Sequence, residues 1–449
     1  MKTDKTRRLG EENINILLFK LSLPAIIGML VMALYSIADT IFIGLGAGSM
    51  AIAGVSVVFP IQMLITTFGQ TIGVGGSSII SRSLGSGELE KSNLTLGNII
   101  MLIIILSALG MGFSYLLIDE ILIIFGAKGE IFAYAHEYFF ILLPGLFFLN
   151  IAMALNNVIR AEGNSKYAMI PMLISALINL ILDPIFIFSF GWGVKGAALA
   201  SVFAQVIAFI FFIYYFGSGK STLKIRFKYF KFNYSIVKEI IAIGSSSFIR
   251  HGASSIVAAV LNNSLIVYHS ELAVAAFGII YRILMVAFMP MFGLAQGFMP
   301  ITGYNFGAKS YNRVKDAIKS STIAAIGFGS LCTGLIFLFP TFIAQMFTDD
   351  PELVELTTKC IKVAIIMLPL VGFQVIGTAY FQAIGKAKPS IFLAVLRQIL
   401  LFIPMVLILP RFFNFEGILY AFPLSDFLAS VITFGMIIPE INKLLSEKA

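Results

Sequence analysis

The stretch Ile178-Asn179-Leu180-Ile181-Leu182-Asp183-Pro184-Ile185-Phe186-Ile187-Phe188 decides how this chain is interpreted. It lies within a longer apolar segment that runs from about Ala168 to Phe190. Asn179 and Asp183 are four residues apart, so they share one face if the segment is a helix. Burying an ionised carboxylate at membrane depth costs several kcal/mol unless it is protonated, paired or hydrated. Such a residue is therefore typical of a site where ions or protons move.

A second isolated carboxylate, Asp39, lies in the apolar segment Tyr35-Ser36-Ile37-Ala38-Asp39-Thr40-Ile41-Phe42. Interpretations without a transport role remain open for these polar residues. Asp39 could extend to the outer membrane surface, and Asp183 could simply end a helix. Asn179 could serve only as a hydrogen-bonding contact between helices, and Ser201, in a later apolar segment, only as a small packing residue.

The composition indicates a membrane protein with many spans. The chain has 449 residues, of which 59% are hydrophobic and 12% are charged, whereas a soluble domain carries about a quarter charged residues. The net charge of +8 does not indicate nucleic-acid binding, since the basic residues gather between apolar segments. Neither the two cysteines, Cys332 and Cys360, nor the three scattered histidines have the spacing of a metal site or a disulfide framework.

Twelve segments are each long enough, at about 20 residues, to cross a bilayer as a helix. Their predicted limits are 16–44, 50–80, 94–118, 131–158, 167–190, 194–217, 238–267, 272–302, 316–339, 354–382, 389–410 and 416–438. Lysines and arginines, Arg160 among them, gather before the first segment and in alternate loops, whereas the opposite loops are acidic. By the positive-inside rule, both termini are predicted to be cytoplasmic.

The two halves of the chain repeat in one register. Separate stretches match at an offset of 222 residues (307 − 85 and 385 − 163): Leu84-Gly85 with Phe306-Gly307, and Ala161-Glu162-Gly163 with Ala383-Ile384-Gly385. Six spans in each half make the repeats parallel. The predicted organisation is an N-terminal lobe, residues 1–217, a basic cytoplasmic linker, residues 218–235, and a C-terminal lobe, residues 236–449. A transporter of the major facilitator type is the alternative organisation, but its charged Gly-x-x-x-Asp loop is not evident between the second and third spans.

Five motifs lie in the first half of the chain, although the resemblance that they carry covers nearly its whole length. They are Pro24, Ala38-Asp39-Thr40-Ile41-Phe42-Ile43-Gly44, Arg160-Ala161-Glu162-Gly163-Asn164, residues 179–187, and Gly193-Val194-Lys195-Gly196-Ala197-Ala198-Leu199-Ala200-Ser201. In their order and spacing they resemble the multidrug and toxic compound extrusion (MATE) family, and within it the DinF-like branch. The resemblance implies an all-α membrane protein whose twelve transmembrane helices form two pseudo-symmetric six-helix lobes around a V-shaped cleft. Drugs of that family leave in exchange for H⁺ or Na⁺.

The resemblance also implies which residues bind the coupling ion and which line the substrate cavity. The site for the coupling ion, H⁺ or Na⁺, would consist of Asp39, Asn179, Asp183 and Ser201. The substrate cavity is predicted to include Asn156, Met172, Gln205 and Tyr35. Two nearby carboxylates in a low dielectric do not both stay ionised, so binding of H⁺ or Na⁺ would neutralise the pair. The first span would then bend at Pro24 and release the drug.

The second half carries a different set of charges inside its spans, namely Arg250, Arg282, Arg397 and Asp426. One interpretation is an internal salt-bridge network around Asp426. The other is a net positive lining of the cleft, which would attract anionic or zwitterionic compounds. Both interpretations stay open.

The predicted function is a secondary active multidrug efflux antiporter that exports small organic, often cationic, compounds from the plasma membrane as a monomer in the lipid bilayer. No cofactor is expected. The chain is not predicted to be an enzyme, because it shows no His/Glu metal motif, no Ser/His set and no aspartyl-protease pair at one depth. The alternative is a lipid-linked glycan or lipid flippase of the same superfamily, which the arginines of the second lobe would suit. A channel is disfavoured by the absence of repeated pore loops.

Overall fold

The computed structural model describes residues 4–446, and every regular element in that range is helical. The elements in chain order are α1 (Asp4–Glu11), α2 (Ile14–Ala47), α3 (Ser49–Ser86), α4 (Leu89–Leu116), α5 (Ile118–Ile124), α6 (Gly129–Ala161), α7 (Ser165–Pro184), η1 (Ile185–Ser189), α8 (Gly193–Gly217), η2 (Phe227–Tyr229), α9 (Tyr234–Tyr268), α10 (Glu271–Gly307), α11 (Tyr311–Leu338), α12 (Pro340–Gln345), α13 (Pro351–Ala364), α14 (Leu368–Ala383), α15 (Ala387–Val395), η3 (Leu396–Phe402), α16 (Ile403–Ile408) and α17 (Pro410–Ser446). The elements η1 and η3 are π-helical, and η2 is a 3-10 turn.

Most of the long helices can cross a bilayer. By length and composition, ten helical segments within residues 4–446 qualify, and the pair of α13 and α14, bent by 54° at a break, makes an eleventh. The remaining predicted span is α9, which has 35 residues but is absent from this set. Ser245, Ser246 and Ser247, followed by Arg250 and His251, make its middle more polar than the other spans.

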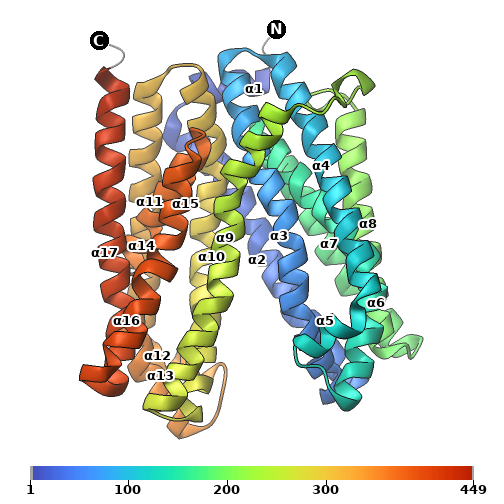
Figure 1. Ribbon diagram of the computed structural model, residues 1–449, viewed down its shortest axis with the longest axis vertical. Coiled ribbons are helices and arrows are strands. Elements are labelled where there is room, and N and C mark those ends of the chain that lie inside the picture. The colour runs from blue at the N-terminus through green and yellow to red at the C-terminus, as the bar shows by residue number, and fades with distance from the viewer. Residues whose placement is uncertain (1–3, 447–449) are drawn as a thin grey trace.

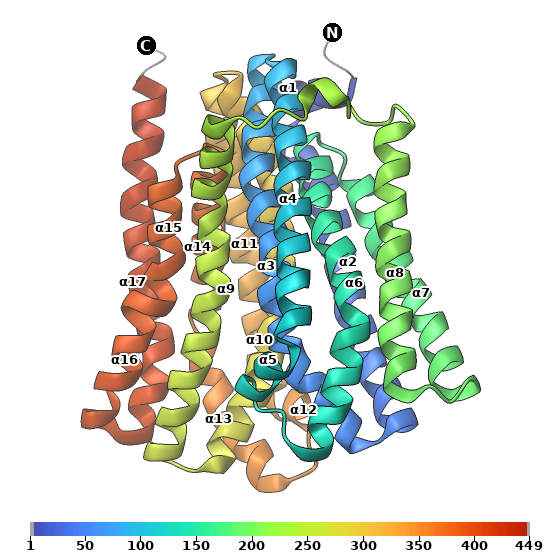
Figure 2. The ribbon, with the colours of Figure 1, turned by 45° about the vertical axis from the view of Figure 1, so that its right-hand side comes forward.

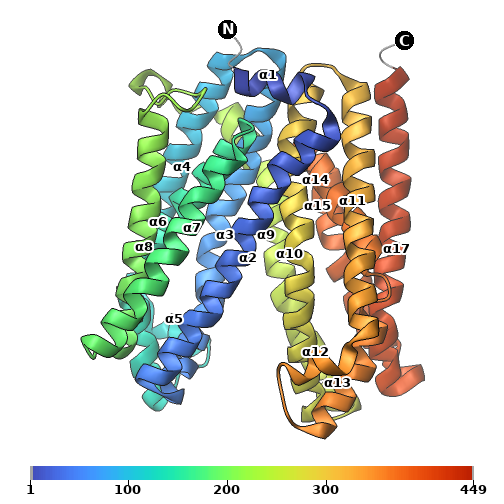
Figure 3. The ribbon, with the colours of Figure 1, turned by 180° about the vertical axis from the view of Figure 1, so that it is seen from behind.

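The helices form two lobes, α2–α8 and α9–α17, which touch at one end and diverge toward the other (Figure 1, Figure 3). One hydrophobic core crosses between the lobes at the touching end, and includes Leu21 and Ile72 of the first lobe and Phe298 and Tyr380 of the second. Toward the diverging end each lobe has a core of its own. We call the touching end the junction.

At the junction the two lobes contact each other symmetrically. A Cβ atom on Gly85 would collide with the backbone carbonyl of Tyr304, and one on Gly307 would collide with the carbonyl of Arg82. Both contacts follow the offset of the sequence repeat, since 307 − 85 and 304 − 82 equal 222. Equivalent residues exchange partners in this way across a twofold axis, so the lobes are related by pseudo-twofold symmetry.

Further glycines bring α2 against α10 and α3 against α9. A Cβ on Gly293 of α10 would meet the backbone of Ile26 on α2, and one on Gly244 of α9 would meet the backbone of Thr71 on α3. Membrane helices associate largely through such close packing of small residues, because lipid is as apolar as their own side chains. These contacts therefore keep the four helices together near the junction.

The segment between α8 and α9 crosses the junction end of the molecule (Figure 2). Two asparagines of α4 hold it in place. Asn93 Oδ1 accepts a hydrogen bond from the backbone N–H of Lys224 at 2.8 Å, and Asn98 Nδ2 donates to the carbonyl of Lys231 at 3.0 Å. The segment is thus attached to the first lobe along its length.

Candidate functional site

Two carboxyl groups meet inside the first lobe. Asp39 lies on α2 and Asp183 lies near the end of α7, and their side chains are at hydrogen-bonding distance from each other. Asp183 is only 1% exposed. Asp39 Oδ1 is buried and has no hydrogen-bond partner among residues 4–446. Two ionised carboxylates contain no donor, so their contact requires a proton or another cation between them.

The other two residues predicted for the cation site surround Asp183. Asn179, one turn earlier on α7, has one amide atom 2.5 Å from Asp183 Oδ2 and the other 3.1 Å from Ser201 Oγ of α8. The orientation with the nitrogen toward Asp183 and the oxygen toward Ser201 satisfies both amide atoms. Asn179 and Ser201 are both buried. The structure thus brings the four residues together from three helices.

Two tyrosines also lie beside the carboxyl pair. Tyr138 of α6 is buried, and its hydroxyl lies within hydrogen-bonding distance of Ser201. Tyr35 of α2, which was predicted to line the substrate cavity, is close enough to Asp39 and Asp183 to interact with both electrostatically. Tyr138 was not predicted. It is one of 15 tyrosines, and nothing in the pattern around it distinguishes it from the others.

The end of α7 accounts for the position of Asp183. Pro184 has no N–H group, so it cannot continue the hydrogen-bonding ladder of the helix. The chain goes on directly as the π-helical turn η1, an element that is frequent at functional sites. Ile187 of this turn packs closely on Gly46 at the end of α2 and lies in the outer core of the first lobe. This packing holds the ends of the two helices that carry the carboxyl groups next to each other.

The arrangement fits H⁺ or Na⁺ as a ligand. Its acceptors are the oxygens of the two carboxyl groups, whereas the Asn179 amide donates to Asp183 and its oxygen is engaged by Ser201. Asp39 Oδ1, a buried acceptor without a partner in the described chain, is the atom that a proton or Na⁺ would satisfy. Within residues 4–446, no group of three or more His, Cys, Asp or Glu side chains could hold a metal ion.

The four residues predicted for the substrate cavity lie in different settings. Asn156 and Met172 both contact Arg160, whose Nε donates to Asn156 Oδ1 at 2.8 Å and whose Nη2 lies 3.6 Å from Met172 Sδ. Gln205 on α8 has a buried Oε1 with no partner among the described residues. Tyr35 lies beside the carboxyl pair instead. Asn156 and Met172 therefore form one cluster around Arg160, whereas Tyr35 belongs with the carboxyl pair.

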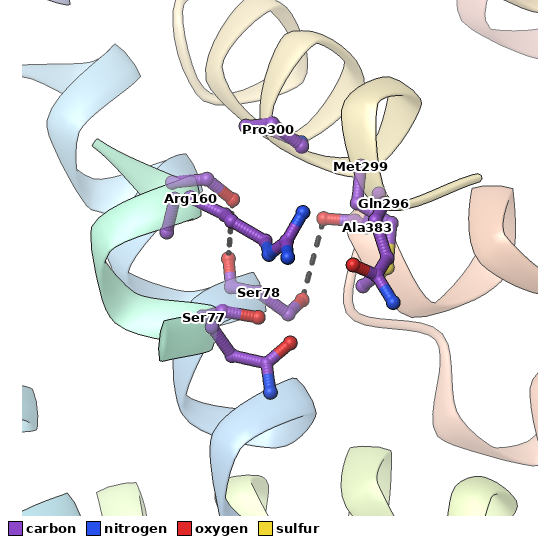
Figure 4. Close-up of a pocket in the computed structure, with 10 residues that line it drawn as sticks. Ser77, Ser78, Arg160, Gln296, Met299, Pro300 and Ala383 are labelled. Atoms are coloured by element: carbon purple, nitrogen blue, oxygen red, sulfur yellow. Dashed lines mark hydrogen bonds between the residues drawn. The ribbon is translucent and has the colours of Figure 1, made fainter. Parts of the chain in front are cut away.

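Arg160 is buried, at 4% exposure, which corrects its assignment to a basic loop. It faces a cavity of about 20 Å³ at the junction, which is room for a single water molecule. Figure 4 shows it with Ser77 and Ser78 of α3 and Gln296 of α10. Ser78 Oγ also donates to the carbonyl of Ala383 on α14 at 3.3 Å. An arginine at the end of a span looks like a loop charge in sequence, and its burial depends on residues of both lobes that pack around it.

Glu162, directly after α6, attaches the linker to the first lobe. Its buried carboxylate accepts hydrogen bonds from the Tyr215 hydroxyl at 3.0 Å, from the backbone N–H groups of Thr222 and Leu223 at 3.3 Å, and from the Ser221 hydroxyl. Burial raises the pKa of Glu162 from 4.5 to about 7, although the four donors favour the ionised form. The sequence motif contains Glu162 without indicating this role.

We expect Glu162→Gln to change how stability depends on pH. The folded state binds a proton on the Glu162 carboxyl more tightly than the unfolded chain does. The contribution of this proton to folding stability is therefore fully present below about pH 4.5 and is lost as the pH rises to about 7. The loss amounts to about 3 kcal/mol. Thermal unfolding of the purified protein in detergent should show this decline for the wild type and a flatter profile for Glu162→Gln. The exposed Glu130→Gln is the control, and a Glu162→Gln profile as steep as that of the wild type would contradict the assignment.

The second lobe contains one ion pair of the predicted network. Arg397 Nε lies 2.5 Å from Asp426 Oδ1, and the Asp426 side chain is almost fully buried. Neither Arg250 nor Arg282 forms an ion pair within residues 4–446, which corrects the four-membered network. The guanidinium of Arg250 lies over the Phe292 ring instead, 5.5 Å from its centroid, and Arg282 is exposed on α10.

A family model and two named relatives match most of this chain. A family model described as MatE matches residues 24–185 and 253–408, which is more than half of the chain. The multidrug export protein MepA of Staphylococcus haemolyticus is 30% identical over 453 residues, covering 100% of this chain and 99% of the relative. MepA of Staphylococcus aureus is 31% identical over 416 residues, which cover 91% of this chain and 90% of the relative.

Solved structures of similar fold match over nearly the whole chain. A multidrug resistance MATE family transporter of the MOP superfamily in its outward-facing conformation has a TM-score of 0.94 at 27% identity, with 99% of each chain covered. A MATE in the bent conformation also has a TM-score of 0.94 at 27% identity, over 100% of this chain and 99% of that chain. A MOP superfamily transporter from Pyrococcus furiosus has a TM-score of 0.92 at 27% identity, again over 99% of each chain. These matches confirm the predicted all-helical architecture of two lobes around a V-shaped cleft.

Proposed function

The chain belongs to the MatE family, and on this premise we propose that it is a secondary active antiporter that exports small organic compounds in exchange for H⁺ or Na⁺. The observation that carries the proposal is the contact between Asp39 and Asp183 inside the first lobe. A contact between two carboxyl groups needs a cation, so it changes with cation occupancy. The Staphylococcus relatives are named as multidrug export proteins, which supports the export of chemically different compounds.

In the proposed cycle, loading of the carboxyl pair with H⁺ or Na⁺ neutralises it and lets α2 bend at Pro24. This helix has two parts with different contacts. Near the junction, Ser22 Oγ donates to the carbonyl of Leu294 on α10 at 3.4 Å, whereas Asp39 lies near the other end. Because Pro24 lacks an N–H group, the helix is weakened between these two contacts. Bending there reshapes the cavity of the first lobe and releases the bound compound.

We also propose that both termini face the cytoplasm and that the protein works as a monomer. Both ends of the described chain lie at the junction end of the molecule (Figure 1). The junction would then be the closed cytoplasmic side, and the V-shaped cleft would open outward. The match to a transporter in its outward-facing conformation supports this orientation.

Everted membrane vesicles test the proposed function directly. Ethidium should accumulate inside vesicles when an acid-inside or a Na⁺-inside gradient is imposed, because the cation then leaves the lumen as the dye enters. Each gradient is applied alone, so the experiment also identifies the coupling ion. Accumulation that depends on ATP, or that is equally fast without any gradient, would contradict secondary antiport.

A further inference from the structure

A cluster of alternating guanidinium and aromatic groups lies in the second lobe. The Arg250 guanidinium of α9 is 5.5 Å from the ring centroid of Phe292 on α10, and the Arg397 guanidinium of η3 is 5.5 Å from that of Phe288. The two phenylalanine rings are neighbours, with centroids 6.3 Å apart. The four side chains therefore form one continuous surface, which we call the arginine–phenylalanine cluster.

The two arginines of the cluster differ in their charge balance. Arg397 is neutralised by Asp426 at 2.5 Å. The Arg250 guanidinium forms no hydrogen bond and no ion pair with any residue of the described range 4–446. The backbone carbonyl of Arg250 accepts a hydrogen bond from Ser254 at 3.1 Å, so the main chain is satisfied while the side chain is not. A half-buried guanidinium without an anion is costly, and it provides five N–H donors in a planar fork.

The cluster lies where the two lobes separate. On α9, the last ring contact with the first lobe is made by Phe248, which lies 6.2 Å from Phe68, and Arg250 follows two residues further from the junction. On α10, Gly293 packs on α2, and Phe292 is the next residue away from the junction. Figure 3 shows α2 and α10 diverging with distance from the junction. Arg250 and Phe292 thus lie at the level where the two lobes begin to separate.

A second arginine, Arg282 of α10, forms no ion pair among residues 4–446 and lies further from the junction. Arg282 is exposed and lies eleven residues before Gly293, which is about three helical turns. It therefore shares the face of α10 that meets α2 at Gly293, about 16 Å further out. The only carboxylate among the predicted charges of this lobe, Asp426, is already paired. Glu271, eleven residues before Arg282, shares this face and is also exposed, so the charge without a counter-ion in the cluster is that of Arg250.

We propose that the arginine–phenylalanine cluster binds the carboxylate of planar aromatic substrates, which would be anionic or zwitterionic compounds. The planar guanidinium of Arg250 matches a carboxylate through two parallel hydrogen bonds. The rings of Phe288 and Phe292 provide an apolar surface for the aromatic body of the same compound. This inference names a substrate class for the proposed export function and rests on that function.

Equilibrium binding tests the inference without any ion gradient. The probes are a rhodamine that carries a free carboxyl group and its methyl ester, and the full-length protein in lipid nanodiscs is titrated into each while fluorescence anisotropy is measured. The ratio of the two affinities is compared between the wild type, Arg250→Gln and Arg250→Lys. Lys359→Gln, which removes an exposed charge at the outer surface of the same lobe, is the matched control.

We expect the preference for the carboxylate over the ester to fall about tenfold in Arg250→Gln, as is typical when a hydrogen bond to a charged group is lost. Arg250→Lys keeps the charge but not the planar fork, so it should retain part of the preference, and Lys359→Gln should retain all of it. A wild type that prefers the ester, or an Arg250→Gln ratio equal to that of the wild type, overturns the inference. Loss of gradient-driven transport would overturn the proposed function without changing this ratio, so the two failures are distinguishable.

Discussion

Asp183→Asn is expected to abolish cation-driven export while leaving the fold intact. Asparagine is nearly the same size as aspartate, so α2, α7 and α8 keep their packing. The asparagine side chain is already neutral and takes up no proton, and it offers one oxygen instead of two to Na⁺. Gradient-driven accumulation of ethidium in everted vesicles should fall on the order of tenfold or more. The coupling free energy between two linked binding sites typically corresponds to a factor of this size.

Asp39→Asn provides the internal check on this result. If the two carboxyl groups act as a unit, the single substitutions should reduce transport equally, and the double substitution should be no worse than either one. Asp349→Asn, at an exposed acid outside the lobe cores, should transport at the rate of the wild type. Undiminished uptake in both Asp39→Asn and Asp183→Asn would remove the basis of the proposed coupling mechanism.

Substituting both glycines of the symmetric contact, Gly85→Ala and Gly307→Ala, is expected to open the junction. Each added Cβ meets a backbone carbonyl, which cannot move aside as a flexible side chain can. Overpacking of this kind costs about 1–3 kcal/mol per site. The conformation that separates the lobes at the junction avoids the collision, so its population should rise on the order of tenfold or more.

Distances between spin labels measure this change. Labels on Lys91→Cys of α4 and Lys388→Cys of α15, both at exposed positions near the junction, report the separation of the lobes once Cys332 and Cys360 have been replaced by alanine. The double glycine variant should add a longer distance to the wild-type distribution and should transport more slowly. Gly110→Ala is the control, because a Cβ there meets no atom within 4 Å. An unchanged distance distribution would show that the junction tolerates the added atoms.

Much of the candidate cation site could be predicted because burying a charge in a membrane is expensive. An isolated acid in an apolar span is therefore conspicuous, and the four-residue spacing of Asn179 and Asp183 places both on one helix face. Tyr138 has no such signal, since tyrosine is common in membrane spans. Arg160 and Glu162 lie at the end of a span, where a charge is ordinarily exposed, and their burial depends on the junction and on the linker that cover them.

The spans show a similar limit of prediction. Eleven of the twelve predicted spans are apolar enough to be recognised as such in the structure, whereas α9 is a long helix whose polar middle includes Arg250 and His251. The polar residues of α9 are tolerated because this part of the helix packs against α3, α10 and α15 or borders the cleft. Hydropathy treats every residue of a span as if lipid surrounded it, and a helix in the interior of a bundle does not meet that condition.

The sequence by itself determined that this protein is a bundle of membrane helices in two repeated halves, because backbone groups in lipid must be satisfied within a helix and because an offset of 222 residues can be read from residue identities alone. Only the tertiary structure decided that Tyr138 lies beside the Asp39–Asp183 pair, that Asp426 pairs with Arg397 and not with Arg250, and that Gly85 and Gly307 meet the opposite lobe. The physical reason is that these contacts depend on the rotation and tilt of helices distant in sequence. Rotation and tilt are set by close packing between whole helix faces, which no local pattern of residues specifies.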